Sequence, residues 1–163
     1  MAARRSAGIL LYQMREAGLF VLLVHPGGPF WARKDFGAWS IPKGEFSEGA
    51  DPQAAALREF EEELGTRPAG ALMPLGDIVQ KGGKRVTGFA VEGDLDAAAI
   101  VSNTFEMEWP PRSGRRATFP EVDRAEWFSL DVAREKILAG QRPFLDRLAA
   151  LIGDRPAAGR RET

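Results

Sequence analysis

The chain of 163 residues contains no cysteine and a single histidine. The absence of cysteine excludes a disulfide framework, a thiol nucleophile and a cysteine-based zinc site. The one histidine, His25, excludes a histidine-rich metal site. Because His25 stands at the end of an apolar run, we expect it to have a structural role rather than a catalytic one.

The sequence also lacks a long apolar run and a net charge of one sign. Its formal net charge is −1, so any anion binding must come from a local group of cations and not from a global field. The first 18 residues lack the cleavage-type stretch of a signal peptide, and no window is apolar enough to span a bilayer. We therefore expect a cytoplasmic protein with no membrane or nucleic-acid partner, present as a monomer or a homodimer.

Hydrophobic periodicity and turn residues predict an α/β (α+β) protein with a mixed sheet between helices. The predicted strands are 7–13, 18–25, 74–80, 85–93, 103–109 and 125–128, and the predicted later helices are 130–138, stopped by Gly140, and 141–152. The length indicates one domain over residues 7–152. Residues 1–6 are expected to be a flexible N-terminus, and residues 153–163 a disordered tail.

The most informative stretch is an acidic helix. Asp51 and Pro52 predict its start, and Gly65 predicts its end as a left-handed cap. Leu57, Phe60 and Leu64 form an apolar stripe that would pack on the sheet.

The other side of this helix is rich in carboxylates. Glu59 lies three residues from Glu62 and four from Glu63, so these side chains can share one face, where they repel one another. A cation among them would relieve the repulsion, and oxygen ligands suit Mg²⁺ or Mn²⁺. The alternative is an ordinary solvated face with pairs such as Arg58 to Glu62.

The stretch from Gly44 to Gly65 resembles the signature motif of the Nudix hydrolases, the MutT-like family. That motif begins with a glycine, which is followed after five residues by a glutamate. Seven residues later it continues with Arg-Glu-apolar-x-Glu-Glu-x-Gly-apolar. Seven positions are in register, namely Gly44, Arg58, Glu59, Phe60, Glu62, Glu63 and Gly65. Ala50 replaces the first glutamate, and Thr66 replaces the final apolar residue. The resemblance implies a Nudix-type α/β/α sandwich.

The resemblance also implies roles for individual residues. Glu59, Glu62, Glu63 and Gly44 match the metal site, and Arg58, Glu59, Glu62 and Glu121 match the catalytic group. Glu121 is included because it precedes Trp127 in the manner of diadenosine-polyphosphate hydrolases. The base is Glu59, Glu62 or Glu121, and the sequence does not choose. The glutamate missing at Ala50 pairs, in the family, with the arginine that matches Arg58.

Two loops and a hairpin turn supply candidate substrate contacts. Trp31, Arg33 and Lys34 combine an aromatic face with cations, which suits a base and a phosphate, or the loop aromatics simply cover the core edge. By resemblance Lys43 lies beside the metal, where it could meet a phosphate. Lys81 and Arg115 are added as phosphate contacts, with solubilising charge at a turn and a flexible surface loop over 110–124 as the alternatives.

The resulting prediction is metal-dependent hydrolysis of a pyrophosphate bond in a nucleoside diphosphate linked to another moiety. Dinucleoside polyphosphates or (deoxy)nucleoside triphosphates are favoured, and ADP-ribose stays open. A Nudix-fold nucleotide or RNA sensor without turnover is the alternative, and Ala50 is the feature in its favour. An acidic-helix interaction module without a metal is a third possibility.

Overall fold

The computed structural model describes residues 5–153, so residues 1–4 and most of the expected tail, 154–163, lie outside it. The strands are β1 Arg5–Arg15, β2 Gly18–Pro26, β3 Lys43–Glu45, β4 Met73–Val79, β5 Arg85–Glu92, β6 Thr104–Glu108, β7 Arg116–Pro120 and β8 Val122–Ser129. The helices are α1 Pro52–Leu64, α2 Leu130–Lys136 and α3 Arg142–Ile152, with 3₁₀ turns η1 Ala97–Ala99 and η2 Ala139–Gln141. No helix in the described range is long and apolar enough to cross a membrane.

A six-stranded mixed sheet forms the body of the protein. Its path is β4-β5-β1-β2-β8, and β3 pairs with β1 outside this path. The β1–β5 pair is parallel and the other pairs are antiparallel. The first half of β1 pairs with β3 and the second half with β2, which brings β3 into the same sheet as the long strands.

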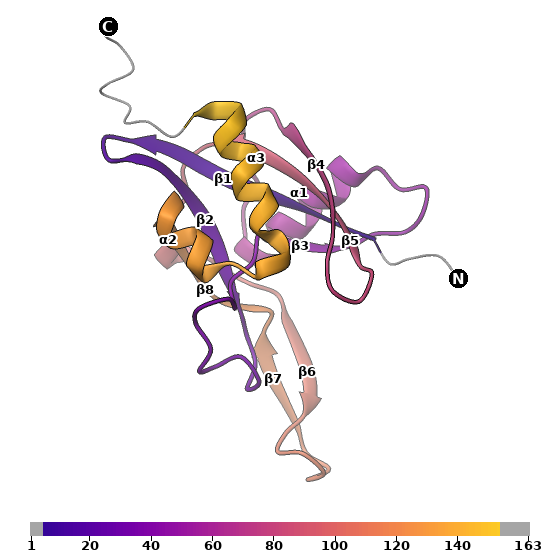
Figure 1. Cartoon of the computed structure of the whole chain (residues 1–163). Helices are drawn as coiled ribbons and strands as arrows, with labels where there is room; N and C mark the ends of the chain where they lie inside the picture. Colours follow the sequence, from indigo (N-terminus) through magenta and orange to yellow (C-terminus); the bar gives the residue numbers. More distant parts are fainter. Residues whose placement is uncertain (1–4, 154–163) are drawn as a thin grey trace, which may run out of the picture.

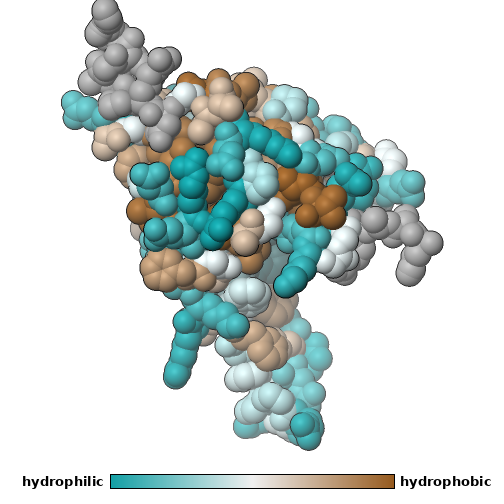
Figure 2. Space-filling view, viewed as in Figure 1, coloured by the Kyte–Doolittle hydropathy of each residue, from teal (hydrophilic) through white to brown (hydrophobic). Residues whose placement is uncertain are grey.

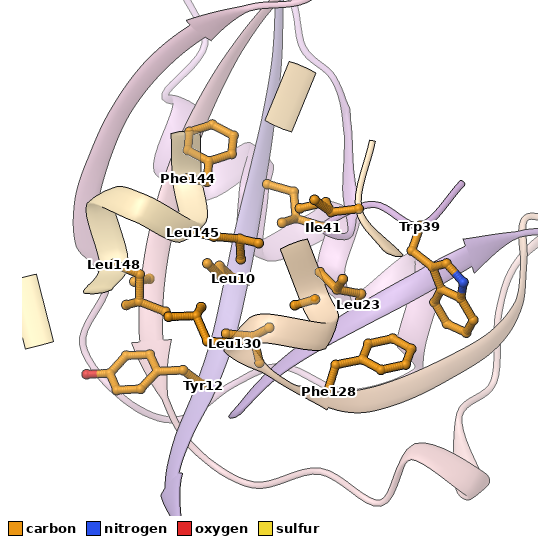
Figure 3. Packing of buried hydrophobic residues seen from close by; sticks show 14 of the residues in the cluster. Leu10, Tyr12, Leu23, Trp39, Ile41, Phe128, Leu130, Phe144, Leu145 and Leu148 are labelled. Carbon is orange, nitrogen blue, oxygen red and sulfur yellow. The ribbon is translucent and has the colours of Figure 1, made fainter. Parts of the chain in front are cut away.

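Helices cover both faces of this sheet (Figure 1). Alternate residues of β1 face opposite sides, since successive side chains of a strand point to opposite faces. Ile9 belongs to the core on the α1 side, together with Phe60. Leu10 belongs to the core on the α3 side, together with Phe144 and Leu145 (Figure 3). The predicted α/β/α sandwich with a mixed sheet is confirmed.

Helix α1 begins and ends where the sequence predicts. The Asp51 carboxylate accepts hydrogen bonds from the backbone N–H groups of Gln53 and Ala54, and Gly65 closes the helix with φ of 88°. Phe60 and Leu64 are buried as expected. Leu57 is only partly buried at the edge of this core, and small residues, Ala55 and Ala56, complete the buried stripe.

Three predicted boundaries are wrong. Strand β1 begins at Arg5 and not at residue 7, because it pairs with β5 from Arg5 onward. Helix α2 ends at Lys136 and not near Gly140, since Ile137 turns to an extended conformation and bridges Trp39. The segment 110–124 is not a loop throughout, because it contains β7 and the start of β8.

Strand β7 pairs with β6 to form a separate two-stranded hairpin, residues 104–120, which we call the arm. The arm projects away from the sheet (Figure 1). Phe105 and Phe119 pack against each other across it, with ring centroids 5.9 Å apart. Its tip is hydrophilic (Figure 2).

Candidate active site

A cavity of about 230 Å³ opens between the end of β2, the loop after it, β3, α1 and the start of β8. Three charged side chains, Lys43, Glu63 and Glu121, stand in its wall. The remaining lining residues are mostly apolar: Val24, Pro26, Trp31, Ala38, Ser40, Ile41, Val122 and Leu138. Such a wall, largely apolar with a few convergent polar groups, is typical of a small-molecule site.

Helix α1 sorts its glutamates by their position around the helix axis. Glu63 points into the cavity, and the Glu59 side chain is only 14% exposed. Glu61 points elsewhere and pairs with Arg67 at 2.6 Å, outside the cavity wall. The helical repeat thus places Glu59 and Glu63 on one side of α1 and Glu61 on another, where Glu61 is a surface charge.

Strand β3 brings Gly44 against the helix. A Cβ atom added to Gly44 would overlap the carboxylate of Glu59, so only glycine leaves room for that carboxylate here. Lys43, the residue before it, projects into the cavity. The short strand therefore holds two of the predicted site residues in place.

The carboxylates of the site strongly perturb one another. Burial, reinforced by the neighbouring charges of Glu59 and Glu121, raises the pKa of Glu63 to about 8, although Lys43 opposes the shift. Burial also raises the pKa of Glu121, helped by Glu59 and Glu62. Glu121, far away in sequence, thus faces the glutamates of α1.

The ammonium of Lys43 is influenced by the same site. Burial lowers its pKa, and Lys84 adds to this effect, while Glu63, Glu45 and Glu59 oppose it. A cation beside partly buried carboxylates, in a cavity wall, is suited to contact a phosphate.

The carboxylates are of the ligand type that divalent cations prefer. In this structure, however, two of them contact an arginine. Across residues 5–153, no three acidic or histidine side chains are close enough together to coordinate a metal. Arg58 instead contacts Glu59 at 3.0 Å and Glu62 at 3.6 Å. Hard carboxylate oxygens suit Mg²⁺ or Mn²⁺, and a cation beside Glu63 would offset the neighbouring negative charges that help to raise its pKa.

The loop over residues 27–38 forms one wall of the cavity through Trp31, and the Lys34 ammonium lies 5.6 Å from the centre of the Trp31 ring. His25 anchors this loop. It is 1% exposed, its Nδ1 lies 2.8 Å from the Asp123 carboxylate, and its Nε2 lies 2.7 Å from the Lys34 carbonyl oxygen. His25 therefore has the structural surroundings that its place in the sequence predicts.

Four of the predicted substrate contacts do not line the cavity. Arg33 and Lys34 are exposed on the loop, Lys81 is exposed in the β4–β5 turn, and Arg115 is exposed in the turn of the arm. Lys84, on the other side of the β4–β5 turn, is the cation of that hairpin whose charge helps to lower the pKa of Lys43. In the sequence, only its position beside two glycines of the turn distinguishes Lys84.

Sequence reasoning also missed cavity residues from distant elements. Ser40 and Leu138 line the wall, and no motif marks them. The Ser40 hydroxyl accepts a hydrogen bond from the buried side chain of Gln141 at 3.0 Å, so the wall is tied to the start of α3. Only the folded chain brings these positions together.

Residues 2–148 match the NUDIX domain family. An RNA pyrophosphohydrolase of Rhodospirillum rubrum is 28% identical over 141 residues, which cover 82% of this chain and 84% of that protein.

Two solved structures show the same fold. A C. elegans Ap4A hydrolase binary complex aligns over 92% of this chain and 98% of that one, with 21% identity and a TM-score of 0.63. The NUDIX domain of Shewanella oneidensis NrtR complexed with ADP ribose aligns over 93% of this chain and 90% of that one, with 16% identity and a TM-score of 0.64.

The family match spans most of the chain and includes the helix, the β3 glycine and the cavity they form. The carboxylates gathered there are chemically suited to the divalent metal ion that Nudix enzymes generally need. The chain belongs to the Nudix family and is a Nudix pyrophosphohydrolase, an enzyme class that cleaves the pyrophosphate bond of nucleoside diphosphate derivatives.

Proposed function

We propose that this enzyme hydrolyses nucleotides in which the pyrophosphate is extended, with dinucleoside polyphosphates favoured over (deoxy)nucleoside triphosphates. The observation that carries the proposal is the composition of the cavity wall. Glu63, Glu121 and Lys43 supply a metal and phosphate region, and Trp31 supplies an aromatic face for a base in the same cavity.

In this proposal Glu59, Glu62 and Glu63 hold Mg²⁺ or Mn²⁺. A metal held by these residues would supply charge neutralisation of the pyrophosphate and activation of water for attack. Gly44 keeps the Glu59 carboxylate in the site, because it has no Cβ to displace that carboxylate. In the metal-free protein Arg58 contacts the carboxylates of Glu59 and Glu62, so a metal would replace Arg58 as their partner.

The reaction transfers a phosphoryl group to water. The water oxygen forms a bond to phosphorus, the bond from phosphorus to the bridging oxygen breaks, and the leaving phosphate takes the electron pair. One carboxylate accepts the proton of the water, and Glu59, Glu62 and Glu121 are the candidates. Lys43 donates hydrogen bonds to a phosphate oxygen from the cavity wall.

The test is product release from a panel of nucleoside triphosphates, dinucleoside polyphosphates, ADP-ribose and 5′-triphosphorylated RNA, with Mg²⁺ and with Mn²⁺. The RNA is included because the similar Rhodospirillum rubrum protein is an RNA pyrophosphohydrolase. We expect metal-dependent turnover that falls by about 100-fold or more in a Glu62→Gln, Glu63→Gln double variant.

Single Gln variants at Glu59, Glu62 and Glu121 then compare the three candidate bases. Replacement of the base should remove the acid limb of the pH profile of kcat, whereas replacement of a metal ligand should raise the metal concentration needed for half-maximal activity. Nucleotide binding without turnover, under every metal condition, would overturn the hydrolase proposal in favour of a nucleotide sensor.

A further inference from the structure

An aromatic pair with one exposed ring joins the loop that lines the cavity to the arm, and the proposed chemistry does not explain it. Phe30 is 63% exposed, although its ring contacts Trp109 edge-on with centroids 5.7 Å apart. Phe30 belongs to the loop over 27–38, and Trp109 directly follows β6 in the arm. A large apolar side chain that is both exposed and held by another ring offers a face to a ligand.

The loop and the arm are joined at the base of the arm, which fixes this pair in place. The backbone N–H of Gly27 donates to the Glu121 carbonyl oxygen at 3.0 Å. Gly28 packs closely against the ring of Phe105, and a Cβ there would lie 3.0 Å from that ring. Phe30 is therefore positioned by two elements and not by the loop alone.

Phe30 also lies one residue from the cavity. Trp31 lines the cavity wall, and consecutive Cα atoms are about 3.8 Å apart. One of these two neighbouring aromatic residues thus lines the cavity, and the other is exposed outside its lining.

Both elements carry cations close to the aromatic pair in the sequence. Arg33 and Lys34 follow Phe30 in the loop, and Arg112 and Arg115 follow Trp109 in the arm. None of these four forms an ion pair within residues 5–153, although the Lys34 ammonium lies over the Trp31 ring. Cations without a carboxylate partner, in the same segments as exposed aromatic rings, suit a base together with its phosphates.

We infer that Phe30, supported by Trp109, is the platform for a second nucleobase of the substrate. One base then contacts Trp31 in the cavity, the phosphates extend past Lys43 and the α1 glutamates, and the second base stacks on Phe30. This inference rests on the proposed function, and it selects substrates that carry two nucleosides. Dinucleoside polyphosphates and the 5′ end of a triphosphorylated RNA share this chemistry.

The test compares Phe30→Ala with wild type on three substrates: diadenosine tetraphosphate, a 5′-triphosphorylated dinucleotide and ATP. Phe30→Tyr should restore the platform. Phe36→Ala is the matched control, because Phe36 is an equally exposed aromatic residue of the same loop, 69% exposed, that lies under Lys136 and not beside Trp109.

For Phe30→Ala we expect kcat/KM to fall about tenfold on a substrate with two bases and to stay within about twofold on ATP. Loss on diadenosine tetraphosphate assigns the platform to a dinucleoside substrate, and loss on the RNA dinucleotide alone assigns it to an RNA end. Equal loss on ATP, no loss on any substrate, or the same loss in Phe36→Ala would overturn the inference.

Binding separates this inference from the proposed function. If wild type turns over none of the substrates, calorimetric titration with diadenosine tetraphosphate in the absence of metal gives the readout. Weaker binding by Phe30→Ala, but not by Phe36→Ala, would support the platform although the hydrolase proposal had failed. Binding unchanged in Phe30→Ala would overturn the platform.

Discussion

Gly44 lies against the carboxylate of Glu59, so the backbone of β3 and a side chain of α1 occupy neighbouring space that no Cβ can share. The φ angle of Gly44 is not among the positive values of the chain, so the backbone itself would accept alanine. What excludes alanine is the position of a single functional group.

The first prediction follows from this contact. In Gly44→Ala the new methyl group should push the Glu59 carboxylate out of place and lower kcat about 10- to 100-fold, because small displacements of catalytic groups are costly. Gly140→Ala is the control, since a Cβ there meets Gln80 only at ordinary contact distance. Steady-state kinetics with thermal denaturation would check it, and unchanged kcat in a folded Gly44→Ala protein would contradict it.

The second prediction concerns pH and stability. The pKa of Glu63 rises from an ordinary 4.5 to about 8 in the metal-free fold, so between these values the folded state binds more protons than the unfolded state. The free energy of unfolding should therefore decrease as pH rises from about 4.5 to about 8. Glu63→Gln removes this loss, and its Tm should exceed that of wild type by several degrees at pH 9 and not at pH 4.

Thermal denaturation in a chelator, over that pH range, measures the difference between the two proteins. Addition of Mg²⁺ at pH 9 should stabilise wild type more than Glu63→Gln, because the ionised carboxylate is a ligand and the amide is a weak one. A constant difference in Tm across the range would show that Glu63 does not titrate in this window.

The third prediction concerns His25 and the cavity wall. The His25 ring makes two hydrogen bonds, from Nε2 to the Lys34 carbonyl oxygen and between Nδ1 and the Asp123 carboxylate, so it ties the loop to the end of β2 and the start of β8. The Lys34 backbone N–H in turn donates to the Trp31 carbonyl oxygen at 2.9 Å. In His25→Phe both bonds from the ring are lost, and we expect KM to rise about fivefold with kcat within about twofold.

A double-variant cycle separates positioning of Trp31 from general destabilisation. If His25 acts through Trp31, His25→Phe should add nothing to the KM of Trp31→Ala. If the increases in KM of the two single variants multiply in the double variant, His25 does not act through the position of Trp31.

The fourth prediction uses the departure from the family motif at Ala50. A cavity of about 300 Å³ lies between Ala50 and Arg58, lined also by Glu45, Phe46 and Ser47. In Ala50→Glu the new carboxylate can pair with Arg58 and draw it away from Glu59 and Glu62. We expect the metal concentration for half-maximal activity to fall about two- to fivefold. Ala50→Gln is the control, because it fills the same space without the charge, and an equal effect in both variants would exclude the ion pair as the cause.

Much of the site follows from local sequence signals. Helix α1 could be bounded because its start and end signals are local: a carboxylate cap at Asp51, a proline at its first position and a left-handed glycine at its end. The register of Glu59, Glu62 and Glu63 then follows from the helical repeat. The same repeat placed Phe60 and Leu64 in the core, where the structure has them.

Errors arose where pairing with distant residues outweighs local preference. Segment 110–124 is rich in proline, glycine and arginine and reads as a loop, yet β7 forms there because β6 supplies its hydrogen-bonding partner. Helix α2 ends early because Ile137 bridges Trp39 in a distant segment. Lys81 and Arg115 have suitable charges, but both are exposed in turns and neither lines the cavity.

The sequence by itself therefore determined the family, the carboxylate-rich helix α1 and the sandwich of helices and sheet, because caps, glycines and periodicity act over a few residues. Only the tertiary structure decided that Gly44 meets Glu59, that Glu121 faces α1 and that Phe30 meets Trp109. Each of these contacts joins segments far apart in the chain, and its geometry depends on how the sheet and the arm pack as a whole.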